Sequence, residues 1–426
     1  MTTINAKYFF MKTKLHFSIF MLFACIFTYA QETTVDLSMG AGYANQVYYK
    51  LSTETENSFE ASSWDIAFLS TSVYSQAMIA NHSIGVLVFE ASSDISEWDT
   101  IDVADESSWT QLYNSDTERA NGAFNQGSAT YGWGEYDVVS HAVSGSIIFI
   151  LKYADGSYKK FMCEDYTYGV YNIKYASWDD ETSTWGEDKT AAIDTSASTD
   201  TNYDYYSLQN EEHVVAEPAS TDWDLFFGRY VTDLGGGTMY LVSGVLHADG
   251  VEVAETTATN TTTDLDYSIY INTMGYDWKA YNSDIYSFVV DSDTHYYVKD
   301  TDENIFKMYF TEFAGSSTGD VQFVFEDVTA TLDIEEVGQN VSFGIYPNPL
   351  GASKTLNVIF DINTANQDDY RLEIYSLSGQ KVYQEDVANS LGFYNKQLDL
   401  SNLSQGVYLL NFKAGNYNTS KKIIIQ

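Results

Sequence analysis

The sequence predicts an all-β protein, and three observations support this prediction. Apolar and polar residues alternate in short runs separated by Gly, Asn, Asp and Ser, as expected for strands that bury one face. Stretches with the period of an amphipathic helix are scarce, and only three prolines occur, so strands are rarely interrupted. Aromatic residues make up 16% of the chain, which is rich for a disordered sequence and sufficient to build several cores.

The first segment, residues 1–30, has the pattern of a Sec signal peptide. Lys12 and Lys14 precede a mostly apolar stretch over 17–28, and small residues end the segment at Ala30. The apolar stretch is too short to cross the hydrocarbon layer as a helix. The segment therefore predicts an exported chain that loses its N-terminus.

Composition limits the partners and the covalent chemistry of such a chain. The formal net charge is −39, and the absence of a basic stripe makes nucleic acid an unexpected partner. The acidity instead suits a protein that stays soluble outside the cell. Whether translation starts at Met1 or Met11, Cys25 leaves with the signal segment. Because only Cys163 then remains, no internal disulfide is expected.

Two parts of the chain repeat one another and predict homologous β domains at 44–190 and 203–330. A Tyr-Tyr-x-Leu strand, a Trp-Asp-aliphatic-x-Phe strand and a three-stranded meander with a lysine recur in the same order. The matching positions are 48–51 and 205–208, Trp64 and Trp223, and Lys160 and Lys307. In each Trp-Asp pair we expect the indole to face the core and the carboxylate to accept backbone N–H groups, which is a structural role.

The last segment, residues 334–426, predicts a third and smaller β domain. The motif YPNP at 346–349 is typical of an extended entry turn, and LSGQ at 377–380 is typical of a hairpin turn. A basic and apolar strand ends the chain at 421–425. Strands at this spacing indicate a small Ig-like β-sandwich.

This last segment resembles the type A C-terminal sorting domain of the Bacteroidota type IX secretion system. The matching pieces are YPNP, YSLSGQKV, LDLSNLSQGVYLLNF and the Lys-rich end. The resemblance implies Sec export and then passage through the outer membrane by the type IX machinery. It also implies removal of this domain and, in many members, attachment to surface lipopolysaccharide. The expected location is therefore the secreted fraction or the outer cell surface.

The two repeats resemble the HmuY family of secreted, β-rich haem-binding proteins. The resemblance rests on WDIAF with ILKYADGSYKKF, and on WDLFFGRYVTDLGGG with YVKDTDENIFKMYF. The second repeat keeps Arg229-Tyr230 and the glycine run 235–237, whereas the first has FLSTSVYSQ in their place. The family implies haem or porphyrin as ligand and a hemophore-like role in iron acquisition.

Haem iron needs one or two axial ligands, normally His or Met, inside an apolar aromatic pocket. The second repeat is the better candidate, with Tyr230 and Tyr240 as wall residues. The candidate ligands are His247 and His295 with Met239 as a substitute in the second repeat, and His82 and His141 in the first.

The sequence predicts a non-enzymatic protein, because no metalloprotease, phosphate-loop or nucleophile-elbow motif occurs. Two other functions stay open. A surface glycan-binding protein or adhesin would use exposed Tyr and Trp rings to stack on sugars. A secreted hydrolase is the third reading, because 60 acidic residues could supply a carboxylate pair.

Overall fold

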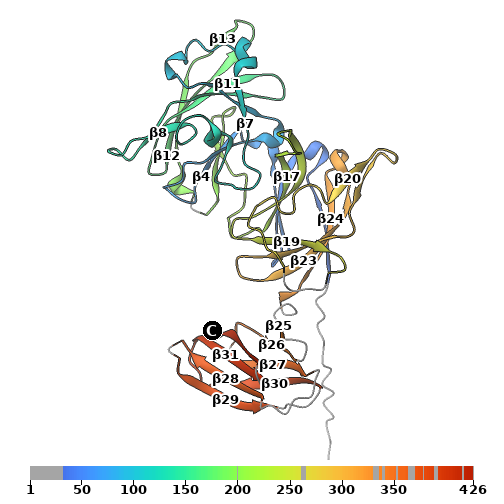
Figure 1. The fold of residues 1–426 in the computed structure, drawn as a ribbon. Helices are drawn as coiled ribbons and strands as arrows, with labels where there is room; N and C mark the ends of the chain where they lie inside the picture. The colour runs from blue at the N-terminus through green and yellow to red at the C-terminus, as the bar shows by residue number, and fades with distance from the viewer. Residues whose placement is uncertain are drawn as a thin grey trace, which may run out of the picture.

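The computed structural model describes residues 32–198, 200–260, 265–329, 335–337, 341–351, 354–362, 370–377, 379–387, 392–414 and 417–425. The predicted signal peptide, 1–30, lies outside the described residues. Every described element is a β-strand or a short 3-10 helix, which confirms the all-β prediction (Figure 1). Within these residues, no helix is long and apolar enough to cross a membrane.

Residues 33–60 and 223–329 together form one domain, which we call the split domain. One of its sheets has the strand order β1-β24-β23-β22-β19 and the other β18-β17-β2-β3, and β20 and β21 form a separate hairpin. The strands are β1 Thr33–Ser38, β2 Asn45–Lys50, β3 Thr55–Glu60, β17 Leu225–Asp233, β18 Met239–His247, β19 Glu252–Thr257, β20 Lys279–Asn282, β21 Ser287–Val290, β22 Thr294–Lys299, β23 Ile305–Phe313 and β24 Asp320–Asp327. The 3-10 helices are η1 Ala41–Tyr43 and η8 Gly315–Ser317.

Residues 64–217 form a second, continuous domain, which we call the inserted domain. Its larger sheet has the order β13-β12-β11-β10-β6-β7, extended by β14 on β12 and by β9 and β8 beside β11, and its smaller sheet has the order β16-β15-β4-β5. The strands are β4 Ile66–Leu69, β5 Met78–Ala80, β6 Leu87–Ser92, β7 Thr110–Leu112, β8 Gly134–Tyr136, β9 Val143–Gly145, β10 Ile148–Lys152, β11 Tyr158–Thr167, β12 Val170–Asp179, β13 Thr184–Trp185, β14 Lys189–Asp194, β15 Tyr203–Ser207 and β16 Glu212–Val214. The 3-10 helices are η3 His82–Ile84, η4 Ile95–Glu97, η5 Val103–Ser108, η6 Ala123–Gln126 and η7 Thr195–Ala197, and η2 Ala61–Ser63 leads into the domain.

The C-terminal segment forms a two-sheet sandwich, as predicted. Its sheets have the orders β25-β26-β27-β30 and β29-β28-β31-β32, and stacked Phe343 and Phe412 lie in the core with ring centroids 4.7 Å apart. The strands are β25 Glu335–Val337, β26 Val341–Tyr346, β27 Thr355–Ile362, β28 Tyr370–Ser376, β29 Lys381–Val387, β30 Gly392–Asp399, β31 Gly406–Ala414 and β32 Tyr417–Ile425.

The two repeats exchange their N-terminal strands. The Tyr-Tyr strand of the first repeat, β2, pairs with the Trp-Asp strand of the second, β17, so that Tyr49 lies opposite Leu225. The Tyr-Tyr strand of the second repeat, β15, pairs with β4 of the first, so that Tyr206 lies opposite Ile66. The registers match, and β1 and β14 extend the two meanders in the same way, on β24 and β12.

The domain boundaries therefore differ from the predicted 44–190 and 203–330. Repetition in a sequence shows which segments are alike, but it does not show which copy each segment pairs with. Here β1 to β3 complete the core built by the second repeat, and β14 to β16 complete the core built by the first.

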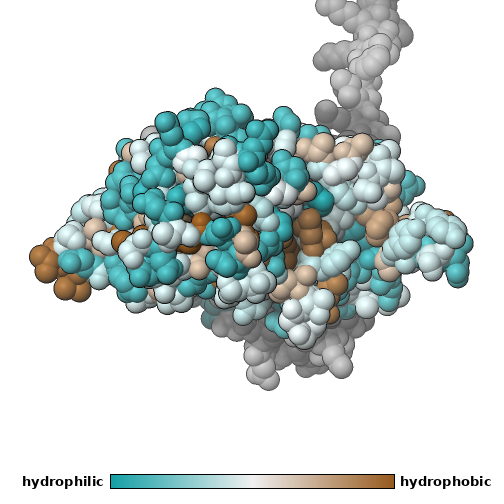
Figure 2. Space-filling model, turned by 90° about the horizontal axis from the view of Figure 1, so that it is seen from above, coloured by the Kyte–Doolittle hydropathy of each residue, from teal (hydrophilic) through white to brown (hydrophobic). Residues whose placement is uncertain are grey.

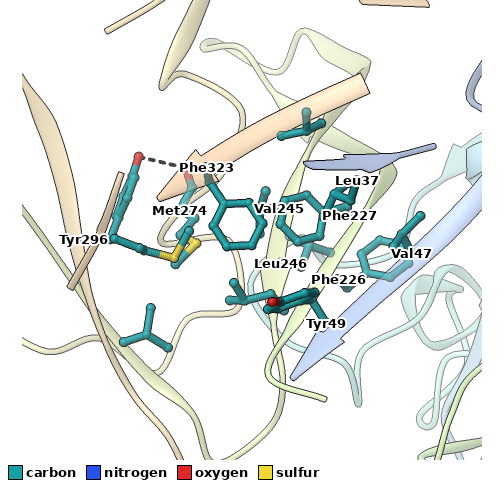
Figure 3. Packing of buried hydrophobic residues seen from close by; sticks show 14 of the residues in the cluster. Leu37, Val47, Tyr49, Phe226, Phe227, Val245, Leu246, Met274, Tyr296 and Phe323 are labelled. Carbon is teal, nitrogen blue, oxygen red and sulfur yellow. Dashed lines mark hydrogen bonds between the residues drawn. The ribbon is translucent and has the colours of Figure 1, made fainter. Parts of the chain in front are cut away.

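The exchanged segment contributes buried side chains to the core of the split domain (Figure 3). Phe323 contacts both Phe227 and Tyr49, with ring centroids 5.6 Å and 5.4 Å away. Leu37 and Val47, also from the exchanged segment, are buried in the same cluster. Each buried side chain of this kind contributes about 1.5–3 kcal/mol. A few of them already match the total stability of a typical domain, about 5–15 kcal/mol.

We predict that a fragment of residues 64–217 folds alone, whereas a fragment of residues 44–190 does not. The first contains β15 and β16, while the second lacks them and exposes the apolar residues of β2. Circular dichroism during urea denaturation should show one cooperative transition for 64–217 and a gradual change for 44–190. Equally cooperative transitions with similar midpoints would contradict the exchanged pairing.

Candidate functional site

In each domain, the aspartate of the Trp-Asp motif hydrogen-bonds to residues at the end of the exchanged strand. Asp224 accepts hydrogen bonds from the Lys50 ammonium at 2.7 Å and from the Leu51 N–H at 2.8 Å. In the other domain Asp65 accepts from the N–H of Gln209 at 3.2 Å and from the Ser207 hydroxyl at 3.3 Å. These bonds confirm the predicted structural role of both aspartates.

The two tryptophans of the motifs pack on the exchanged tyrosines in matching ways. Trp223 meets Tyr48 edge to face with centroids 5.0 Å apart, and Trp64 meets Tyr205 at 4.9 Å. All four side chains are buried. Each domain therefore has one buried Trp–Tyr pair where its exchanged strand meets the Trp-Asp strand.

A buried acid, Glu217, lies near the second of these pairs. Its carboxylate is 2% exposed and accepts a hydrogen bond from the Tyr203 N–H at 2.7 Å. Burial raises its pKa to about 7, because desolvation outweighs the Tyr203 N–H and the positive charge of Arg119. The Arg119 guanidinium lies 4.7 Å from the Trp223 ring centroid and donates to the carbonyl of His247 at 2.9 Å.

Two of the predicted haem ligands are buried and already occupied. His247 places its ring nitrogens 3.1 Å and 2.7 Å from the carbonyls of Ala248 and Tyr270. His82 bonds the Val86 carbonyl at 2.7 Å through Nδ1, and its Nε2 accepts the Asn114 N–H at 3.2 Å. Burial lowers the pKa of both imidazoles.

The other three candidates lie in separate places. His141 is exposed near the tip of the β8–β9 hairpin, where its Nδ1 lies 2.7 Å from the Tyr136 hydroxyl. His295 on β22 stacks on Tyr309 of β23 with centroids 4.5 Å apart, and burial lowers its pKa. Met239 begins β18 and is partly exposed.

These residues do not fit a haem site. The cavity beside His82 and Tyr230 has a volume of about 100 Å³, below the roughly 300 Å³ at which small-molecule pockets begin. His295 borders a separate depression that also contains Glu32, Lys307 and Glu326, and Tyr240 is 60% exposed. Within the described residues, no group of three or more His, Cys, Asp or Glu side chains is arranged to hold a metal ion. Haem binding stays a prediction that this geometry does not favour.

The surface contains several separate depressions. In the face shown in Figure 2, most residues are hydrophilic, and hydrophobic colour is limited to small spots and one projecting tip. One depression, which we call the tryptophan depression, lies beside β11 to β13 of the inserted domain and has a volume of about 480 Å³. Among its lining residues are Trp178, Trp185, Asp99, Asp102 and Glu187.

The tryptophan depression is built on a rigid base. Trp178 on β12 and Trp185 on β13 meet edge to face with centroids 5.0 Å apart, and the Trp185 indole N–H donates to the Ile101 carbonyl at 2.7 Å. Beneath them the buried Lys160 donates to the Trp98 carbonyl at 2.8 Å. Its Nζ lies 4.3 Å from the centroid of the Trp98 ring and 5.3 Å from that of Trp185.

Asp188 ties this base together electrostatically. It accepts from the Trp98 indole N–H at 2.9 Å and pairs with Lys174 at 2.8 Å. Burial alone would raise the pKa of Asp188, but the bonds from Lys174 and Trp98 outweigh burial and lower it. Burial likewise lowers the pKa of Lys160. Asp188 is therefore held as a structural carboxylate, while Asp99 and Glu187 are exposed around the rings.

The sequence analysis did not identify this depression. Its signal is the stretch SWDDETSTWGED at 177–188, where two tryptophans flank a turn and five acidic residues surround them. That stretch follows the last strand of the first repeat and has no counterpart after the second. Features shared by the two repeats therefore do not reveal it.

The comparisons with known proteins identify the C-terminal domain. A model of the secretion system C-terminal sorting domain matches residues 344–426. The chain therefore carries a type IX secretion sorting domain, and it is a secreted or cell-surface protein that contacts the type IX machinery. The match does not extend to residues 33–329, so the HmuY resemblance stays a prediction. No curated protein matches the chain.

Solved structures add no argument about function. The ectodomain of the C. elegans fusion protein EFF-1 aligns at 8% identity with a TM-score of 0.16, over 93% of this chain and 94% of that one. The BSP domain of a biofilm-associated protein aligns at 8% identity with a TM-score of 0.17, over 93% and 81% of the two chains. Scores this low do not establish a shared fold.

We predict that Glu217 makes stability depend on pH. Its folded pKa of about 7 lies above the ordinary 4.5. The unfolded chain therefore releases this proton first as the pH rises, and stability falls between about pH 4.5 and 7. The rise in pKa corresponds to about 3 kcal/mol. Urea denaturation of the wild type and of Glu217→Gln from pH 5 to 8 should show a smaller loss of stability in the variant. Equal pH dependence in the two proteins would refute the assignment.

Proposed function

We propose that the exported chain is a non-catalytic carbohydrate-binding protein of the cell surface, and that the tryptophan depression is its sugar site. The pairing of partly exposed indole rings with exposed carboxylates carries this proposal. It corresponds to the surface glycan-binding alternative rather than to haem binding.

The chemistry of a sugar suits both parts of the depression. A pyranose has one apolar C–H face, which packs on an indole ring, and Trp178 and Trp185 offer ring surface at nearly right angles, 71°. The hydroxyl groups of the sugar need hydrogen-bond acceptors, and ionised carboxylates accept strongly. Asp99 and Glu187 are exposed at the rim and can serve this purpose.

The electrostatics of Asp188 do not suit the acid of a hydrolase. A glycosidase needs one carboxyl whose pKa is raised so that it can protonate the leaving group. In the depression the pKa of Asp188 is lowered. The surrounding acidity also favours neutral or amino sugars, because anionic glycans are repelled by a chain of net charge −39.

The test compares Trp178, which lines the depression, with Trp109, which does not. We predict that Trp178→Ala, in the chain from Gln31 to Gln426, weakens binding of its best glycan on an array at least tenfold, or about 1.4 kcal/mol. Trp178→Phe should retain part of the affinity, since it keeps a ring. Calorimetric titration of purified oligosaccharide provides the measurement.

Trp109→Ala is the matched control, because Trp109 is also partly exposed but lies outside the depression. If both alanine variants lost affinity equally, or if the parent bound no glycan, the proposal would fail. A parallel titration with ferric haem, watched for a Soret shift, would restore the haem prediction if the parent responded.

A further inference from the structure

A second depression lies in the split domain, far along the sequence from the tryptophan depression. It is an acidic groove of about 740 Å³ beside β1, β21, β23 and β24. Its charged lining residues are Asp36, Glu56, Glu312 and Asp320, and its aromatic ones are Phe288 and Phe313. The described residues that line it include no lysine or arginine.

In the described part of the chain the four carboxylates lack a cationic partner, although the Asp320 carboxylate is hydrogen-bonded to Ser38 and Thr318. Among the residues that the structure describes, the ion pairs involve other acids, such as Glu106 with Lys152, and none involves these four. Asp36 is held in place by the Gln322 amide, which donates to it at 2.7 Å. Partial burial raises the pKa of Glu56, which indicates that a nearby cation would be favourable there.

The described acids include no group of three that could surround one metal. Carboxylates spread along a groove instead match a ligand whose positive charges are also spread out, as in an extended basic peptide.

The aromatic residues point to arginine in particular. Phe288 is partly exposed and packs edge to face on the buried Phe313 with centroids 4.8 Å apart, which fixes its ring at the groove. A planar guanidinium stacks on such a ring and pairs with a carboxylate at the same time, whereas an ammonium is a compact, strongly hydrated charge.

We propose that the acidic groove binds an extended, arginine-containing segment of a partner protein. Arginine side chains stack on Phe288 and pair with Glu312 and Asp36 along the groove. The site is separate from the sugar site, and it gives the exported chain a second, protein-directed partner.

The experiment measures fluorescence anisotropy of labelled octa-arginine, octa-lysine and octa-glutamate with the chain from Gln31 to Gln426. Because a strongly acidic protein attracts any cation, the decisive comparison is between two double variants of equal charge. Asp36→Asn with Glu312→Gln alters the groove, and Asp302→Asn with Glu181→Gln removes exposed acids outside it.

The proposal expects the groove double variant to weaken octa-arginine binding at least fivefold and the outside double variant to change it less than twofold. Phe288→Ala should weaken octa-arginine more than octa-lysine. Equal effects of the two double variants, equal binding of arginine and lysine peptides, or no arginine binding at physiological salt would each overturn it. Urea denaturation of each variant confirms that the split domain is folded.

Discussion

The contact of Asp224 with Lys50 and Leu51 is the constraint on which the arrangement of both domains depends. Lys50 and Asp224 are both buried, so each charge is stabilised only while the other is present. Removing one partner of such a pair typically costs about 3–5 kcal/mol, because the other charge is left buried alone. The contact joins residues 174 positions apart and belongs to the exchanged strand β2. Once it forms, the chain between them has to fold as an insertion.

In the inserted domain the equivalent aspartate, Asp65, holds the exchanged strand in the same register but through different polar groups. Asp65 is met by a hydroxyl and an amide rather than by an ammonium. The surroundings of the two indoles differ as well. The Trp64 N–H donates to the Gln46 side chain at 3.2 Å. The Trp223 ring instead lies against the Arg119 guanidinium, 4.7 Å from the ring centroid. The two domains therefore share their strand pairing but differ in the buried side chains that hold it.

The sequence predicts where the strands of this protein lie better than it predicts which strands pair with each other. Alternation and the repeated anchors predicted strands and a duplication because these signals are local, and the sorting domain followed from the resemblance of YPNP, YSLSGQKV, LDLSNLSQGVYLLNF and the Lys-rich end to a known family. The exchange of β2 and β15 could not be predicted, because both pairings bury the same tyrosines and leave the same pattern. The surroundings of the candidate histidines could not be read from the sequence for a related reason. Whether an imidazole is free depends on how the main chain folds around it, and the carbonyls involved come both from neighbours, such as Ala248 beside His247, and from a separate loop, such as that of Tyr270.

The insertion also has a mechanical consequence. The chain enters the inserted domain through residues 61–63 and leaves it through 218–222, and both connections return to the split domain. A load applied to the inserted domain is therefore divided between two covalent tethers in parallel, whereas domains arranged as beads on a string would carry it through one. A protease that cuts one connection leaves the domain attached through the other. Release of the inserted domain by proteolysis therefore requires two cuts.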